Sequence, residues 1–302
     1  MNTTLAPGAP ATPSPAARLA REVLGLFKLR IGVMIMLTAL AGWAITPGPS
    51  LGLAQFLVLA LSVLVSSASA GAYNQYAEAD IDRLMTRTRR RPFATGALKP
   101  SGAWLALIAL LLAVSVASAW WALNAMTALY VFLGAFFYAV VYTVWLKRRS
   151  WLNIVVGGLA GSFAVLAGAA AVDPTPGALP LLLALVLFLW TPPHFWSLAI
   201  AHRDDYAAAG VPMLPVVVGV ARAARIVFWS TVALVAASLL PALFGAGPIY
   251  LGAAAVGGFL FLRKAWALAR RPSRKTAMAS FFASLAQLGL VLAGACLDAL
   301  AR

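Results

Sequence analysis

The sequence predicts an all-α integral membrane protein with nine transmembrane helices. Of its 302 residues, 63% are hydrophobic and only 10% are charged, whereas soluble domains carry about 25% charged residues. Many apolar runs reach the ~20 residues that are needed to cross ~30 Å of hydrocarbon. Lipid must therefore solvate most of the surface, because the chain has too few polar residues to cover itself.

Segments rich in Pro, Gly or charge divide the apolar sequence into nine expected spans. The clearest breaks are residues 46–50 (TPGPS) and 173–177 (DPTPG). The first 17 residues carry no charge and match neither a secretory signal nor a transit peptide. We expect residues 1–21 to be a disordered tail, followed by one membrane domain over residues 22–302. The expected spans are 27–46, 52–73, 101–121, 124–145, 151–171, 178–201, 222–242, 246–268 and 277–298.

The basic residues alternate between loops in a way that supports this count. All of the 23 Lys and Arg residues except Arg302 lie before or at the start of span 1 or near the loops that follow even-numbered spans. The positive-inside rule then places the N-terminus in the cytoplasm and the C-terminus outside. Because topology explains the net charge of +15, no nucleic-acid partner is expected. Because the N-terminal segment is neither a secretory signal nor a transit peptide, a bacterial inner membrane is favoured, and the lipid bilayer is the expected surrounding.

Five of the eight acidic residues fall in two short windows on the expected cytoplasmic side. The first window contains Asn74, Glu78 and Asp82 at spacing i, i+4, i+8. If span 2 continues as a helix, these three form one stripe and Asp80 points away. The second window contains Asp204 and Asp205. Ion pairing with neighbouring Arg on a solvated loop would also explain these acids.

Oxygen ligands in a stripe suit Mg²⁺, which takes a few carboxylates together with substrate phosphate oxygens. We expect Glu78, Asp82 and Asp205 to hold the metal. Arginine donates paired hydrogen bonds to phosphate, so the neighbouring basic side chains are candidates for binding a diphosphate. These candidates are Arg83, Arg87, Arg91, Lys99, Lys147 and Arg203. Acids and bases interleaved at a membrane surface indicate a lipid diphosphate as substrate.

The same segment carries a resemblance to a known family. Residues 74–92 (NQYAEADIDRLMTRTRRRP) resemble the first Asp-rich motif of the UbiA superfamily of intramembrane prenyltransferases. The sequence pattern DID…M..RT..RP is similar to that of the haem O synthase branch of this superfamily. Residues 142–162 and 190–219 also resemble that branch. The family usually has Asp where this chain has Glu78, and the second acidic segment departs from the general superfamily spacing.

The resemblance covers roughly residues 22–300 and implies a nine-helix bundle around a central cavity. It implies transfer of a farnesyl group from farnesyl diphosphate to a vinyl group of protohaem IX, with Mg²⁺ as cofactor and a possible partner that receives the haem. Asn74, Glu78 and Asp82 carry over to Mg²⁺–diphosphate binding and catalysis. Tyr73, Tyr138 and Tyr142 could face the allylic cation or could be interfacial aromatics.

The only two histidines, His194 and His202, are candidate haem contacts. Pro192 and Pro193 are expected to interrupt span 6 just before His194, as broken helices do where they line a cavity. His194 is also expected to share a helical face with Asp205, three turns away. A chance kink is the alternative. Asn153 and Gln287 could form interhelical hydrogen bonds.

Three other functions fit parts of this pattern. They are prenyl transfer to another aromatic acceptor, transport of haem or lipid, and haem binding without chemistry. The PPHFW segment argues against the first, and charges confined to loops argue against a transporter.

Overall fold

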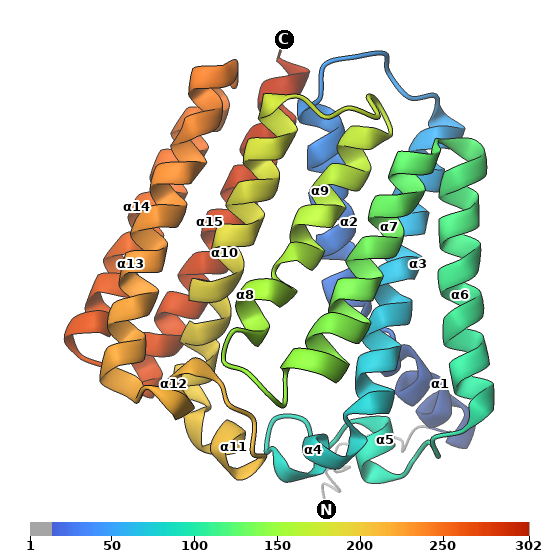
Figure 1. The fold of residues 1–302 in the computed structure, drawn as a ribbon, viewed down its shortest axis with the longest axis vertical. Coiled ribbons are helices and arrows are strands. Elements are labelled where there is room, and N and C mark those ends of the chain that lie inside the picture. Colours follow the sequence, from blue (N-terminus) through green and yellow to red (C-terminus); the bar gives the residue numbers. More distant parts are fainter. Residues whose placement is uncertain (1–13, 302) are drawn as a thin grey trace, which may run out of the picture.

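The computed structural model describes residues 14–301, which form helices and no strand. Within those residues, nine helical segments are long and apolar enough to cross a membrane, so the predicted all-α fold with nine spans is confirmed. They stand side by side, and four short helices cap one end (Figure 1). The short helices are α4 (Ala79–Leu84), α5 (Pro92–Thr95), α11 (Arg203–Ala208) and α12 (Leu214–Val217).

The spans consist of one or two helices each. Single helices form five of them: α3 (Leu53–Ala77), α6 (Gly102–Ala122), α10 (Ala178–Ala201), α14 (Pro248–Arg270) and α15 (Arg274–Leu300). The first span joins the end of α1 (Pro15–Leu26) to α2 (Leu29–Ile45). The remaining pairs are α7 (Ala125–Phe136) with the π-helix η1 (Phe137–Leu146), α8 (Asn153–Gly157) with α9 (Leu159–Ala170), and α13 (Val220–Leu239) with the 3₁₀ helix η2 (Leu240–Phe244).

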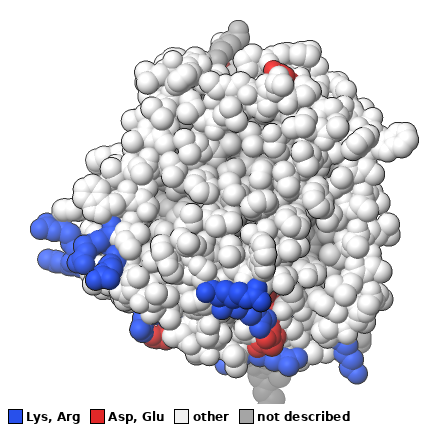
Figure 2. Space-filling model, in the orientation of Figure 1, with Lys and Arg blue, Asp and Glu red and all other residues white. Residues whose placement is uncertain are grey.

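Charge is segregated along the long axis of the bundle. The visible Lys and Arg side chains gather at the end that carries the short helices, whereas the middle of the molecule shows none (Figure 2). Charged side chains are costly in hydrocarbon, so the uncharged band marks the membrane-embedded belt. Both acidic windows lie at the basic end, in and beside α4 and α11.

The N-terminal segment differs from the expected tail. Residues 1–13 lie outside the described residues, but α1 begins at Pro15, inside the segment expected to be a tail. Its sequence is rich in the helix formers Ala, Leu and Arg, and Pro is favoured at the start of a helix. Leu26 is fully buried against Ala72 and Phe93, so α1 packs onto the basic end of the bundle.

The expected interruption of span 6 at the proline pair is wrong. Helix α10 runs from Ala178 to Ala201 with Pro192 and Pro193 inside it. Neighbouring segments can support a helix past proline when they cover the freed backbone groups, and both prolines are buried here. The break comes later, at His202, whose backbone leaves the helical region before α11.

Two glycines allow α2 and α9 to approach each other closely. A Cβ added at Gly168 would overlap the carbonyl oxygen of Ala39, and one added at Gly42 would overlap that of Val165. Small residues permit such contact between membrane helices, where packing replaces the hydrophobic effect as the driving force. At the end away from the basic residues, Asp298 is buried and accepts the backbone N–H of Gly247 at 2.7 Å, which ties α15 to the start of α14.

Replacing Gly168 with Ala should therefore destabilise the bundle by about 1–3 kcal/mol, because backbone of α2 must move to admit the methyl group. Gly252→Ala is the matched control, since a Cβ there meets nothing within 4 Å and alanine favours helix. Thermal unfolding in detergent measures both. Equal melting temperatures for the two variants would contradict the close-packing argument.

Candidate functional site

The predicted acidic stripe exists, although α3 does not continue through it. Helix α3 ends at Ala77, and Glu78 is the junction to α4 with φ −108° and ψ 12°. Backbone hydrogen bonds from Glu78 to Asn74 and from Asp82 to Glu78 nevertheless keep the i, i+4 register across the junction. As a result Asn74, Glu78 and Asp82 are 2%, 1% and 1% exposed, whereas Asp80 lies on the exposed side.

Each buried carboxylate has a cationic partner. Lys147 Nζ lies 2.5 Å from Glu78 Oε2, and Lys147 itself is buried. Arg91 Nη1 donates to both oxygens of Asp82, at 3.0 and 2.8 Å. A buried carboxylate without such a partner would be strongly disfavoured. The ion pairs therefore account for the burial of both acids.

A third cation, which the sequence reasoning did not assign to the site, is Lys28. Its Nζ donates to Asn74 Oδ1 at 2.6 Å and to Tyr138 Oη at 3.2 Å. Lys28 sits at the junction of α1 and α2 with φ 46°, a conformation that costs a non-glycine residue about 1–2 kcal/mol and that is typical of functional sites. The available signal was a lysine just inside an apolar span, two residues before Arg30.

The π-helix η1 supplies the other wall of the cluster. Its i→i+5 backbone spacing appears in the bond from Lys147 N to Tyr142 O, and the side-chain hydroxyl of Thr143 donates to the Tyr138 carbonyl. Residues nine apart lie about 180° around an α-helix, which would turn Tyr138 and Lys147 to opposite sides. In the π-helix both reach residues of the cluster, and Thr143 Oγ1 accepts from Asn74 Nδ2 at 3.0 Å. π-Helical segments are frequent at functional sites.

Tyr138 and Tyr142 stack on each other, with ring centroids 5.7 Å apart. Lys28 Nζ lies 5.7 Å from the Tyr138 ring and Lys147 Nζ lies 5.6 Å from the Tyr142 ring. The two rings therefore face ammonium groups, as cation–π contacts. Tyr73, the third candidate, instead packs near Leu26 in a separate apolar cluster.

The other expected phosphate ligands divide into two groups. Arg87 interacts electrostatically with Tyr142 and with His202, so it lies between the two acidic windows. Arg83 donates to the Ala94 carbonyl and holds the loop that follows α4. Arg203 contacts the Pro215 carbonyl and Asp204, and Lys99 is exposed. The structure brings Lys147 and Arg91, but not these last three, onto the buried acids.

In the second acidic window, Asp205 is the inward residue. The Asp204 side chain is 96% exposed, whereas that of Asp205 is 18% exposed and lies 3.9 Å from His202 Nδ1. Burial lowers the pKa of His202, Arg87 and Arg274 lower it further, and Asp205 opposes them. The expected helical face shared by His194 and Asp205 is wrong, because the helix breaks at His202 between them.

His194 is 6% exposed and lies between α10 and α15, where Nδ1 is 2.7 Å from Ser284 Oγ. Asn153 is fully buried and donates to the Lys147 carbonyl at 3.4 Å, which is a local contact and not an interhelical one. Both amide atoms of Gln287 are buried without a hydrogen-bond partner among the described residues. The expected interhelical bond of Gln287 is therefore absent from the described part of the chain.

The buried cluster fits a hard cation. Its donors are carboxylate and amide oxygens, and the buried Glu78 Oε1 has no hydrogen-bond partner within the described residues. No three His, Cys, Asp or Glu residues of the described chain lie together as a ready-made metal site. Mg²⁺ does not require one, since it is usually bound by one or two carboxylates plus substrate phosphates. Glu78 and Asp82 supply such a pair, and Asn74 supplies a further oxygen.

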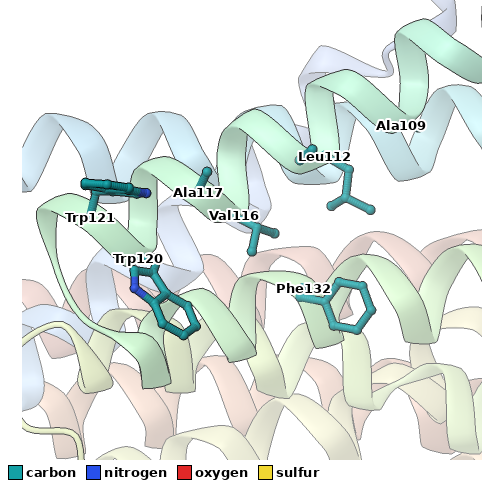
Figure 3. A pocket seen from close by; sticks show the side chains of 8 residues that line it. Ala109, Leu112, Val116, Ala117, Trp120, Trp121 and Phe132 are labelled. Carbon is teal, nitrogen blue, oxygen red and sulfur yellow. The ribbon is translucent and has the colours of Figure 1, made fainter.

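Two apolar grooves lie apart from this cluster. One, of about 520 Å³, lies on the surface of α6 and α7 and is lined by Leu112, Val116, Trp120 and Phe132 among others (Figure 3). The other, of about 600 Å³, lies between α2 and α15 and includes Trp43 and Cys296. The first carries no titratable side chain and faces outward, as expected of a surface that contacts lipid.

Comparison with known proteins decides the family. Residues 35–286 match the UbiA prenyltransferase family. The chain belongs to the UbiA prenyltransferase family. It is 60% identical to "Protoheme IX farnesyltransferase 2" of Paramagnetospirillum magneticum over 90% of this chain and 94% of the relative. The resemblance stated from the sequence is thus confirmed.

Solved UbiA structures share the fold. A UbiA homologue from Aeropyrum pernix aligns with a TM-score of 0.74 at 25% identity, covering 90% of this chain and 98% of that one. A homologue from Archaeoglobus fulgidus, bound to GPP and Mg²⁺, aligns with a TM-score of 0.68 at 18% identity, covering 90% and 99%.

The burial of the two ion pairs leads to a stability prediction. Glu78→Ala should destabilise the protein by about 3–5 kcal/mol, because Lys147 is left buried without its counter-charge. Asp80→Ala is the matched control. Arg148 donates one hydrogen bond to each Asp80 oxygen, both at 2.7 Å, but this ion pair is exposed, and exposed pairs contribute at most about 1 kcal/mol. Thermal unfolding in one detergent compares them. A similar drop in melting temperature for both variants would show that the ion pair of Glu78 with Lys147 is solvated.

Proposed function

We propose that this UbiA-family enzyme transfers a farnesyl group from farnesyl diphosphate to a vinyl group of protohaem IX. The observation that carries the proposal is the 60% identity, along nearly the whole chain, to a relative named for that reaction. The buried cluster of cations and carboxylates supports it, because the cluster offers partners for both halves of a metal–diphosphate complex.

The metal belongs to the carboxylates in this proposal. Glu78 and Asp82, with Asn74 and the half-buried Asp205, would hold Mg²⁺. When bound, the ion supplies Lewis-acid stabilisation of the charge that develops on the leaving diphosphate. The UbiA homologue solved with GPP and Mg²⁺ supports this choice of cofactor.

The cations act on the diphosphate. Arg91 pairs with Asp82 and Lys147 pairs with Glu78 in the structure as it stands, while Lys28 lies beside them on Asn74 and Tyr138. If the carboxylates bind a metal ion, the same ammonium and guanidinium groups become available to phosphate oxygens. They are then preorganised where negative charge develops, with Arg87 and Arg203 as further candidates nearer the surface.

Heterolysis of the C1–O bond gives the electron pair to diphosphate and leaves an allylic cation on farnesyl. The vinyl π electrons of protohaem form the new C–C bond, and water adds to the resulting cation with loss of a proton, giving the hydroxyl group. Burial of Asn74, Glu78 and Asp82 keeps stray water from the first cation. His194 is proposed to contact the haem, His202 is the weaker candidate, and a protein that takes up the product is expected downstream.

Chemical analysis of the product tests this function. Incubation of the purified enzyme with protohaem, farnesyl diphosphate and Mg²⁺ should yield haem that is heavier by one farnesyl group and one hydroxyl group, detected by mass spectrometry. Asp82→Asn should lower the rate about a hundredfold, which is roughly 3 kcal/mol of lost transition-state stabilisation, while Glu78→Asp should keep much of it. Asp80→Asn is the control on the exposed face. Prenylation of an aromatic acid in place of haem would favour the rival acceptor.

The orientation is also part of the proposal: the basic end, with the cluster, faces the cytoplasm of a bacterial inner membrane. In a background that lacks Cys296, cysteines at Ser50 and Thr175 should label from outside intact cells, and those at Ala97 and Ala207 should not. All four positions are exposed. Gly48 and Gly247 are unsuitable, because a Cβ there would overlap Val172 and Asp298. External labelling at Ala97 would reverse the orientation.

A further inference from the structure

The contact between His194 and Ser284 determines which nitrogen of the imidazole carries the proton. Ser284 Oγ lies 2.6 Å from the Phe281 carbonyl oxygen and 2.7 Å from His194 Nδ1. A carbonyl can only accept a hydrogen bond, so the single hydroxyl proton of Ser284 is donated to Phe281. The hydroxyl oxygen must then accept from His194, which places a proton on Nδ1.

A neutral imidazole with its proton on Nδ1 has an unprotonated Nε2. Nε2 makes no hydrogen bond to the described residues and is not among their fully buried polar atoms that lack a partner. The lone pair of Nε2 is therefore the free coordinating position of His194. Metal-ligating histidines commonly donate their other ring N–H to a neighbouring acceptor in this way.

Aromatic neighbours hold the ring in a single orientation. Trp190 stacks on the imidazole with centroids 4.1 Å apart and planes at 19°, and Phe281 does so at 4.5 Å and 26°. Two rings at those distances cannot share one face, so the imidazole is sandwiched between them. The sandwich covers the faces of the ring, and Phe195 lies against its edge, with centroids 5.2 Å apart and planes at 87°. An axial ligand bond must therefore use the part of the edge where Nε2 lies. Trp190 Nε1 also donates to the Ser284 carbonyl at 2.9 Å.

This arrangement is close to the prenyl-transfer cluster. Helix α10 packs on α8, and Asn153, the first residue of α8, donates to the carbonyl of Lys147. Helix α10 therefore links His194 to the segment that follows Lys147, the proposed diphosphate-binding lysine.

We propose that Ser284 is a positioning residue, which fixes His194 in the Nδ1–H form and presents Nε2 to the iron of the acceptor porphyrin. The inference rests on the proposed function for the identity of the acceptor. It assigns to Ser284 a role that its sequence context, one small residue within an apolar span, does not indicate.

The chain provides a matched control on the same helix. Ser280 lies one turn before Ser284 on α15, and both serines are fully buried. Ser280 Oγ bonds Ser197 Oγ of α10 at 2.9 Å, so it bridges the same two helices without touching the histidine. Loss of a buried interhelical hydroxyl is common to both alanine variants, and only Ser284→Ala removes the acceptor for Nδ1–H.

Nitrogen NMR of protein labelled with ¹⁵N-histidine reads the tautomer directly, and only two histidines need to be assigned, with a His202→Gln variant to separate them. The wild-type His194 should show a protonated Nδ1 and a bare Nε2. Ser284→Ala should convert part of the population to the Nε2–H form, whereas Ser280→Ala should not. Ser284→Thr, which keeps the hydroxyl, should restore the wild-type signals.

A titration with protohaem supplies the second measurement. Ser284→Ala should weaken haem binding by about 10–100-fold, as loss of an outer partner of a metal ligand does, and shift the haem absorption spectrum toward that of His194→Ala. Ser280→Ala should retain the wild-type affinity and spectrum. If Ser284→Ala does not fold, the wild-type tautomer and the Ser284→Thr variant decide the question.

Two results would overturn the proposal: a wild-type His194 protonated on Nε2, or Ser284→Ala and Ser280→Ala with the same haem spectrum and affinity. Failure of the proposed function is a separate result. If the wild-type enzyme forms no farnesylated haem, the reaction is wrongly assigned, and the nitrogen signals still report the state of His194.

Discussion

The ion pair between Lys147 and Glu78 is the constraint on which the site depends. A carboxylate that is 1% exposed at the edge of a bilayer must have a cation beside it. Two departures from regular α-helix accompany this pair. Helix α3 ends at Ala77, so that Glu78 lies in the junction to α4, and the fourth span changes from α-helix to π-helix before Lys147. The Arg91–Asp82 pair and the bond from Lys28 to Asn74 complete a network around the same stripe.

Under the proposed function, this network keeps the acids ready for a metal before any substrate arrives. Without a cationic partner, burial of these carboxylates would be strongly disfavoured. In the proposal, the cations that pair with them also suit the anionic half of the incoming substrate. A single set of side chains thus stabilises the acids and prepares the site for the diphosphate. The stacked tyrosines reinforce it, because their faces cover the two ammonium groups.

Sequence reasoning reached the features that depend on local pattern. Hydrophobic length and the alternation of basic loops gave the nine spans, and four-residue spacing gave the stripe of Asn74, Glu78 and Asp82. The resemblance to the family assigned Glu78 and Asp82 to the proposed metal site. The four-residue spacing also separated Asp80 from them, and the pKa of Asp80 is lowered by an exposed hydrogen bond to Arg148 rather than by the cluster.

Features that depend on tertiary contacts could not be predicted from local sequence pattern. Lys28 is distant in sequence from Asn74 and Tyr138, and its left-handed backbone has no composition signal. The π-helix occurs in an apolar run with no Pro or Gly to mark it. Pro192 and Pro193 suggested a break that packing prevents, and His202 produced one without any helix-breaking residue. Ser284 gains its significance only from the histidine opposite.

The π-helix has a mechanical consequence. The change from α-helical to π-helical pitch falls entirely within Phe137–Leu146, so Ala125–Phe136 keeps its α-helical register in the bilayer. A change of pitch within Phe137–Leu146 would rotate Lys147 relative to Glu78 and leave the preceding helix in place. The part of the span that can alter its pitch in this way is the part that ends at the charged side chain.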